Sequence, residues 1–184
     1  MFIDAMRSKW SEFGNVDSAA LLEVWGLIKA TLDRQAGPDA SDVWPVSPAE
    51  LGAGKSTAAK VWCATAQQPR VLIVVRTKDQ ADEYARDNNA WSGRPLAFAH
   101  HSGLPLATRR DLDALVAYPV LVVCHKSYEN GLDDFAVDVS RLKFERMHQA
   151  RSLVIIDEAL DQVHEERIPR DALKALLTQM PRAV

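Results

Sequence analysis

The chain has 184 residues and a formal net charge of −3, so no overall positive charge draws it to nucleic acid or to an acidic membrane surface. Its 47% hydrophobic and 26% charged residues are typical of a globular domain that is large enough for a sheet covered by helices on both faces. No apolar run is long enough to span a bilayer and the first residues do not resemble a signal peptide, so we expect a cytoplasmic protein without a membrane partner.

The first 40 residues predict two helices. A second amphipathic helix follows the first, with Asp17 or Ser18 as its N-cap, and it ends at Gly37 and Pro38. The apolar residues of the first helix recur at helical spacing: Phe2, Ile3, Met6, Trp10 and Phe13. No residue here indicates chemistry, so we interpret residues 1–40 as a helical flank that covers one edge of the sheet and residues 41–184 as the main domain.

From residue 42 onward, short β-rich runs alternate with helical segments. This alternation predicts right-handed βαβ units and a mostly parallel sheet sandwiched by helices. The expected strands are residues 43–46, 71–75, 96–99, 120–124 and 153–156. The expected helices are residues 55–66, 79–91, 109–117, 139–149, 159–166 and 170–180.

The Gly-rich loop, residues 49–57, predicts a phosphate-binding P-loop. Its glycines let backbone N–H groups close around phosphate oxygens, Lys55 supplies a positive charge, and the following helix points its N-terminus at the anion. We expect the strand at residues 43–46 to precede the loop. The residues expected to bind the nucleotide are Ala49, Gly52, Ala53, Gly54, Lys55, Ser56 and Thr57.

A second motif lies about a hundred residues further along, where the apolar strand at residues 153–156 ends in Asp157 and Glu158. The carboxyl end of a parallel strand is where open α/β sheets bind ligands. A carboxylate at Asp157 suits Mg²⁺, together with the Ser56 hydroxyl, and Glu158 is the candidate to polarise an attacking water. The two motifs together predict ATP and Mg²⁺ as cofactors.

These segments resemble superfamily 2 helicases. Residues 49–56 are similar to motif I of that family, and Ile155, Ile156, Asp157, Glu158 and Ala159 are similar to its DEAD-like motif II. Residues 71–81 are similar to motif Ia, and residues 120–127 to the strand that ends in Thr-His before motif II. The resemblance covers roughly residues 42–165.

The resemblance implies the first RecA-like domain of a P-loop NTPase, lying along a DNA or RNA strand. By position, it implies that Lys55 and Ser56 contact phosphate and metal, Asp157 the metal, and Glu158 the catalytic water. The residues it places on the nucleic-acid side are Arg76, Thr77, His125 and Lys126. No second RecA-like domain follows in the chain, so we expect slow hydrolysis by this domain alone. A second RecA-like domain would either act in trans or have been lost by truncation.

Two alternatives to a helicase or translocase remain open at this stage. A phage-type terminase or packaging ATPase also has a P-loop and an apolar strand that ends in Asp-Glu. A degenerate nucleotide-binding module would instead bind ATP without turnover and act through protein contacts. ATP hydrolysis measured with and without nucleic acid distinguishes these three functions. A small-molecule kinase is disfavoured, because no Arg-rich lid follows the second motif.

Overall fold

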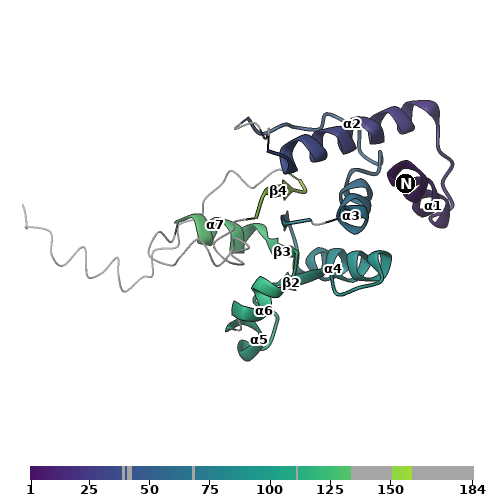
Figure 1. Cartoon of the computed structure of the whole chain (residues 1–184). Coiled ribbons are helices and arrows are strands. Elements are labelled where there is room, and N and C mark those ends of the chain that lie inside the picture. Colours follow the sequence, from purple (N-terminus) through teal and green to yellow (C-terminus); the bar gives the residue numbers. More distant parts are fainter. Residues whose placement is uncertain (39, 41–42, 68, 111, 134–150, 159–184) are drawn as a thin grey trace, which may run out of the picture.

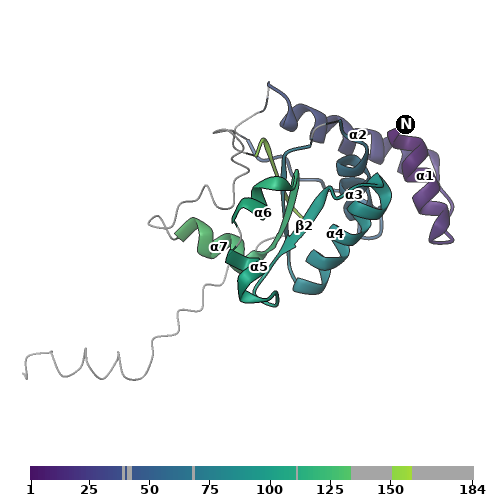
Figure 2. The ribbon, with the colours of Figure 1, turned by 60° about the horizontal axis from the view of Figure 1, so that its bottom comes forward.

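The computed structural model describes residues 1–38, 40, 43–67, 69–110, 112–133 and 151–158. These residues form an all-parallel, four-stranded sheet with helices packed on both faces (Figure 1, Figure 2). The expected α/β class with a parallel, helix-covered sheet is therefore confirmed. Within the described residues, no helix is both long and apolar enough to cross a bilayer.

The elements follow one another in a regular order along the chain. The helices are α1 (Phe2–Glu12), α2 (Ala19–Ala36), α3 (Lys55–Thr65), α4 (Lys78–Ser92), α5 (Leu106–Arg110), α6 (Leu112–Ala117) and α7 (His125–Asp133). The strands are β1 (Val71–Val75), β2 (Ala97–His100), β3 (Val120–Cys124) and β4 (Leu153–Ile156).

The strands lie in the order β2-β3-β1-β4, so β1 is central and β4 pairs with β1 alone among the described strands. Val71 at the start of β1 is level with Val120 on one side and Leu153 on the other. All four strands consequently end at the same edge of the sheet. The segments that follow β1, β3 and β4 are thereby brought close together, although they are far apart in sequence.

Alternation along β1 divides the interior into two cores, because successive strand side chains point to opposite faces. Val71, Ile73 and Val75 pack with α3 and α4 on one face. Leu72 and Val74 pack on the other face with residues of α6 and α7. All five side chains of β1 are buried, which explains why the strand is apolar throughout rather than alternating with polar residues.

The N-terminal helices pack mainly on α3 rather than only along one edge of the sheet (Figure 1). Phe2 and Met6 of α1 and Trp25 of α2 are buried in the same core as α3. Ser18 is the N-cap of α2, and its hydroxyl accepts a hydrogen bond from the Leu21 N–H. The flank is therefore continuous with the main core on the α3 side.

The prediction of a strand at residues 43–46 is wrong. Residues 44–50 have no regular secondary structure, and Val43, Trp44 and Val46 remain exposed. Pro45 and Pro48 lack the amide hydrogens that a sheet ladder needs. The segment also gains no burial in the described sheet, so its β-propensity is not enough to form a strand.

Other boundaries differ less. The helix expected from residue 109 begins at Leu106, and the strand expected at residues 96–99 is shifted by one residue. Helix α7 is absent from the sequence prediction; Tyr128 is the residue of α7 in the second core. The helices expected at residues 139–149, 159–166 and 170–180 lie outside the described residues.

Candidate functional site

The Gly-rich loop is an irregular segment that leads directly into α3, without the expected strand before it. Gly52 and Gly54 have φ values of +84° and +76°, a region that side chains with a Cβ disfavour. A turn closes the loop where the Ala53 N–H donates to the Glu50 carbonyl at 3.2 Å. The Gly54 carbonyl then accepts from the Ala58 N–H at 2.8 Å and starts the helix.

Lys55 curls back over the loop from the first position of α3. Its Nζ donates to the carbonyl oxygens of Ala49, at 2.6 Å, and Glu50, at 2.9 Å. These neutral acceptors can be exchanged for the stronger charged acceptors of a phosphate. Thr57, also expected to bind nucleotide, is half-buried in the first turn of the same helix.

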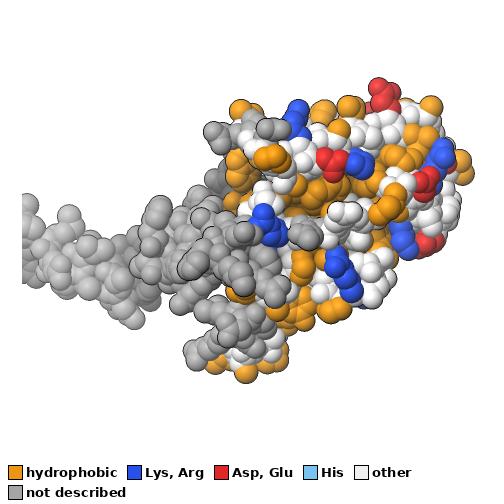
Figure 3. Space-filling view, viewed as in Figure 1, with side chains coloured by type: hydrophobic (Ala, Val, Ile, Leu, Met, Phe, Trp, Pro, Cys, Tyr) orange, Lys and Arg blue, Asp and Glu red, His pale blue; other side chains and the backbone are white. Residues whose placement is uncertain are grey.

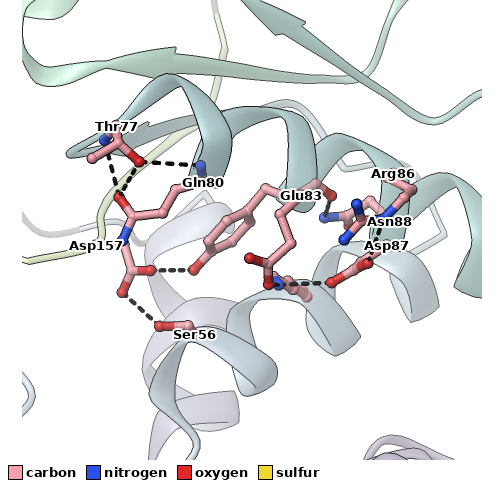
Figure 4. Close-up of polar contacts among 10 residues, drawn as sticks. Ser56, Thr77, Gln80, Glu83, Arg86, Asp87, Asn88 and Asp157 are labelled. Carbon is pink, nitrogen blue, oxygen red and sulfur yellow. Dashed lines mark hydrogen bonds and ion pairs between the residues drawn. The ribbon is translucent and has the colours of Figure 1, made fainter.

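Asp157 and Ser56 lie side by side, although 101 residues separate them (Figure 4). The Ser56 hydroxyl donates to Asp157 Oδ1 at 3.0 Å. The Asp157 N–H donates to the Val74 carbonyl at 2.9 Å, which continues the pairing of β4 with β1 beyond the strand itself. The sheet register therefore determines where this carboxylate lies.

Tyr84 is a third member of the site, and sequence reasoning missed it. Its hydroxyl donates to Asp157 Oδ2, and its side chain comes from the buried stripe of α4. Burial raises the pKa of the Tyr84 phenol well above its ordinary value, and the negative charge of Asp157 adds to that increase. The sequence signal was a tyrosine on the buried face of α4, whose hydroxyl needs a hydrogen-bond partner, but nothing in the sequence identifies that partner.

A buried lysine packs against the ring of Tyr84. Lys60 of α3 is only 6% exposed, and its Nζ lies 4.7 Å from the centre of the Tyr84 ring. The same Nζ contacts Glu83 at 2.6 Å and Asp87 at 2.7 Å, both on α4. These contacts fix the separation of α3 and α4. They therefore also fix the distance between Ser56 on α3 and Tyr84 on α4.

Glu158 follows Asp157 and is exposed. Its φ of +77° is the single positive value among non-glycine residues in the described part of the chain. Such a left-handed conformation costs about 1–2 kcal/mol for a residue with a Cβ. An observed outlier of this kind is a reason to suspect a functional constraint at that position.

The four residues expected on the nucleic-acid side do not have equal access to solvent. Arg76, Thr77 and Lys126 are exposed at the edge where the strands end. Thr77 also caps α4, exchanging hydrogen bonds with Gln80 (Figure 4). His125 is only 5% exposed, and neither ring nitrogen has a hydrogen-bond partner among the described residues. The imidazole is therefore buried, unlike the other three side chains.

The N-terminal helices also reach the Gly-rich loop. Trp25 of α2 donates from its indole Nε1 to the Ala53 carbonyl at 2.9 Å.

Comparison of the chain with protein-family models, with curated proteins and with solved structures found no match. Functional inference therefore rests on this geometry and on the sequence motifs.

Proposed function

We propose that this chain binds a nucleoside triphosphate with Mg²⁺ at the Gly-rich loop and serves as the ATP-binding domain of a helicase or translocase. The observation that carries this proposal is the contact between Ser56 and Asp157, at 3.0 Å. A hydroxyl at a helix N-terminus and a strand-end carboxylate provide the oxygen ligands, direct or through water, that Mg²⁺ prefers beside a phosphate.

Each residue then has a defined role. Lys55 would transfer its hydrogen bonds from the loop carbonyls to phosphate oxygens, and Ser56 and Asp157 would hold the metal ion. The bound Mg²⁺ would neutralise phosphate charge. Glu158, next to the metal carboxylate and exposed, accepts a hydrogen bond from a water molecule and orients it. Oδ2 of Asp157 accepts from Tyr84 and Oδ1 accepts from Ser56, so Oδ1 is the carboxylate oxygen that would help the Ser56 hydroxyl to hold the ion.

The proposed nucleic-acid side is a basic edge formed by Arg76, Lys78 and Lys126, which are all exposed. Val75 and Cys124 are register partners, so Arg76 and Lys126 follow adjacent strands. On the face shown in Figure 3, basic and acidic side chains are interspersed. With a net charge of −3, attraction for a phosphate backbone must come from a local group such as this edge.

Nucleotide binding is tested first, with Lys55→Ala and with Lys29→Ala as the matched control. Lys29 forms an exposed ion pair with Asp33 on α2 and does not touch the loop. Loss of a charged donor to phosphate should weaken ATP binding by roughly ten- to a hundredfold in Lys55→Ala, measured by calorimetry. Unchanged affinity in Lys55→Ala, with the fold retained, would refute the assignment of the site.

Turnover is tested by measuring ATP hydrolysis with and without single- and double-stranded nucleic acid. Stimulation by nucleic acid, lost in Glu158→Gln, supports the helicase or translocase. Hydrolysis without stimulation by free strands fits a packaging ATPase better. Binding without hydrolysis, unchanged by Glu158→Gln, supports a nucleotide-binding module and rejects the catalytic role of Glu158.

Nucleic-acid binding is tested by its salt dependence. Replacing Arg76 and Lys126 by alanine should reduce the slope of log affinity against log salt by about 0.7–0.9 for each phosphate group that the variant no longer neutralises. Arg86→Ala is the control, because Arg86 is an exposed basic residue further along α4. An equal change in the control would mean that binding is not localised at the basic edge.

A further inference from the structure

The Gly-rich loop rests on a pair of tryptophans from the N-terminal helices. Trp10 of α1 and Trp25 of α2 meet edge to face, with ring centres 5.4 Å apart. Trp25 is completely buried, and its indole N–H donates to the Ala53 carbonyl at 2.9 Å. This bond links residues 28 positions apart in sequence and fixes one peptide group of the loop from outside.

The direction of that peptide group has a consequence for anion binding. In a trans peptide the carbonyl and the N–H point in opposite directions across the same plane. Holding the Ala53 carbonyl toward Trp25 therefore points the Gly54 N–H away from Trp25. This N–H has no hydrogen-bond acceptor among the described residues. It is a donor held in one orientation and left available for a phosphate oxygen.

Packing leaves room at this point for glycine only. A Cβ placed on Gly54 would lie 2.9 Å from Cζ3 of Trp10 and 3.4 Å from Nε1 of Trp25. At Gly52, which also has a positive φ, a Cβ would meet no atom of the described residues within 4 Å. The tryptophan pair is thus in direct contact with the part of the loop that adjoins α3, and not with its outer turn.

We propose that Trp25, supported by Trp10, is a positioning residue that orients the Ala53–Gly54 peptide for phosphate binding. The N-terminal helices are then part of the nucleotide site. This inference rests on the proposed function, and it assigns the role to the indole N–H and not merely to the bulk of the ring. The ligand group concerned is the phosphate chain rather than the base or the sugar.

The test compares Trp25→Phe with Trp62→Phe. Both residues are buried tryptophans whose indole N–H donates one hydrogen bond, and Trp62 donates to Asp33 at 2.8 Å, away from the loop. Affinities for ATP and for inorganic tripolyphosphate are measured by calorimetry, and unfolding midpoints by circular dichroism. Tripolyphosphate isolates the phosphate contacts, because it carries neither base nor sugar.

Trp25→Phe should weaken binding of both ligands by about three- to tenfold, which corresponds to the loss of one hydrogen bond. Trp62→Phe should lower the unfolding midpoint but leave both affinities unchanged. Unchanged affinities in folded Trp25→Phe, or an equal loss in Trp62→Phe, would overturn the inference. Absence of ATP binding by the unaltered chain would reject the proposed function itself, so the two failures are distinguishable.

A second variant covers the case in which Trp25→Phe does not fold. Replacing Trp25 by β-(3-benzothienyl)alanine substitutes sulfur for the indole N–H at nearly unchanged volume. Weaker binding of tripolyphosphate by this protein supports the role of the N–H. Affinity equal to that of the unaltered chain contradicts it.

Discussion

Replacing Tyr84 by phenylalanine tests the site at the contact that joins α4 to Asp157, the proposed metal ligand. The change removes one hydroxyl and leaves the ring, which is 3% exposed and packed against Lys60. Asp157 then keeps the Ser56 donor on Oδ1 and loses the Tyr84 donor on Oδ2. The perturbation is therefore confined to one half of one carboxylate.

The expected cost follows from the kind of bond that is lost. A hydrogen bond to a charged group contributes about 1.5–3 kcal/mol. Because Asp157 is partly exposed and water can replace some of the lost bond, we expect about 2 kcal/mol. For a protein of this size, that lowers the unfolding midpoint by roughly 4–8 °C. Loss of a group that orients a metal ligand typically weakens metal binding by about ten- to a hundredfold.

The assay has two parts: thermal unfolding, and ATP binding titrated over a range of Mg²⁺ concentrations. Tyr128→Phe is the matched control, because Tyr128 is also buried and makes no hydrogen bond to another described residue. Tyr84→Phe should need more Mg²⁺ for the same ATP affinity, whereas Tyr128→Phe should not. A Tyr84→Phe protein that matches the unaltered chain in both measurements, or an equal change in Tyr128→Phe, would refute the role of the Tyr84 hydroxyl.

Three further predictions concern stability and are all measurable by urea unfolding. Gly54→Ala should lower the free energy of unfolding by about 2–3 kcal/mol, and Gly52→Ala by only about 1 kcal/mol. Both positions have a positive φ that alanine disfavours, but only at position 54 does the added Cβ collide with Trp10. Arg151→Met should lower the free energy of unfolding by about 2–4 kcal/mol, since this buried guanidinium donates to carbonyls of α6, β1 and the segment before β3. Burial raises the pKa of Cys63 from 9.0 to about 12, so its contribution to stability is complete below pH 9 and is lost as the pH rises toward 12. Between about pH 8 and pH 10.5 the unaltered chain should lose about 2 kcal/mol more than Cys63→Ala.

Each of these predictions has a result that would contradict it. Equal losses for the two glycine variants would mean that Trp10 moves aside without cost. A fully stable Arg151→Met would mean that desolvation of the guanidinium cancels its hydrogen bonds. Parallel pH profiles for Cys63→Ala and the unaltered chain would mean that the thiol ionises normally in the folded state.

Features set by local sequence were predictable. The apolar β-branched runs of β1, β3 and β4 were identified with their observed bounds, because such strands are buried on both faces. The proximity of Ser56 and Asp157 also followed from the motifs, since parallel strands end at one edge of the sheet.

Features that depend on tertiary contacts were missed. Nothing near Tyr84 or Trp25 in sequence indicates that their polar tips meet Asp157 and Ala53, because those partners are 73 and 28 residues away. At residues 43–46 the error was the reverse: a strand was predicted that the structure does not form. Its residues favour a strand locally, but Pro45 removes a ladder donor, and the described sheet offers the segment no burial.

The separation of 101 residues between Ser56 and Asp157 has a consequence for synthesis of the chain. Translation adds about 5–20 residues per second, so the Gly-rich loop is made roughly 5–20 s before its carboxylate partner. During that interval α1, α2, α3 and β1 can already pack together, while β4 still has to join β1 at the end of the sheet. The nascent protein is therefore expected to form the proposed phosphate loop before it forms the proposed metal site.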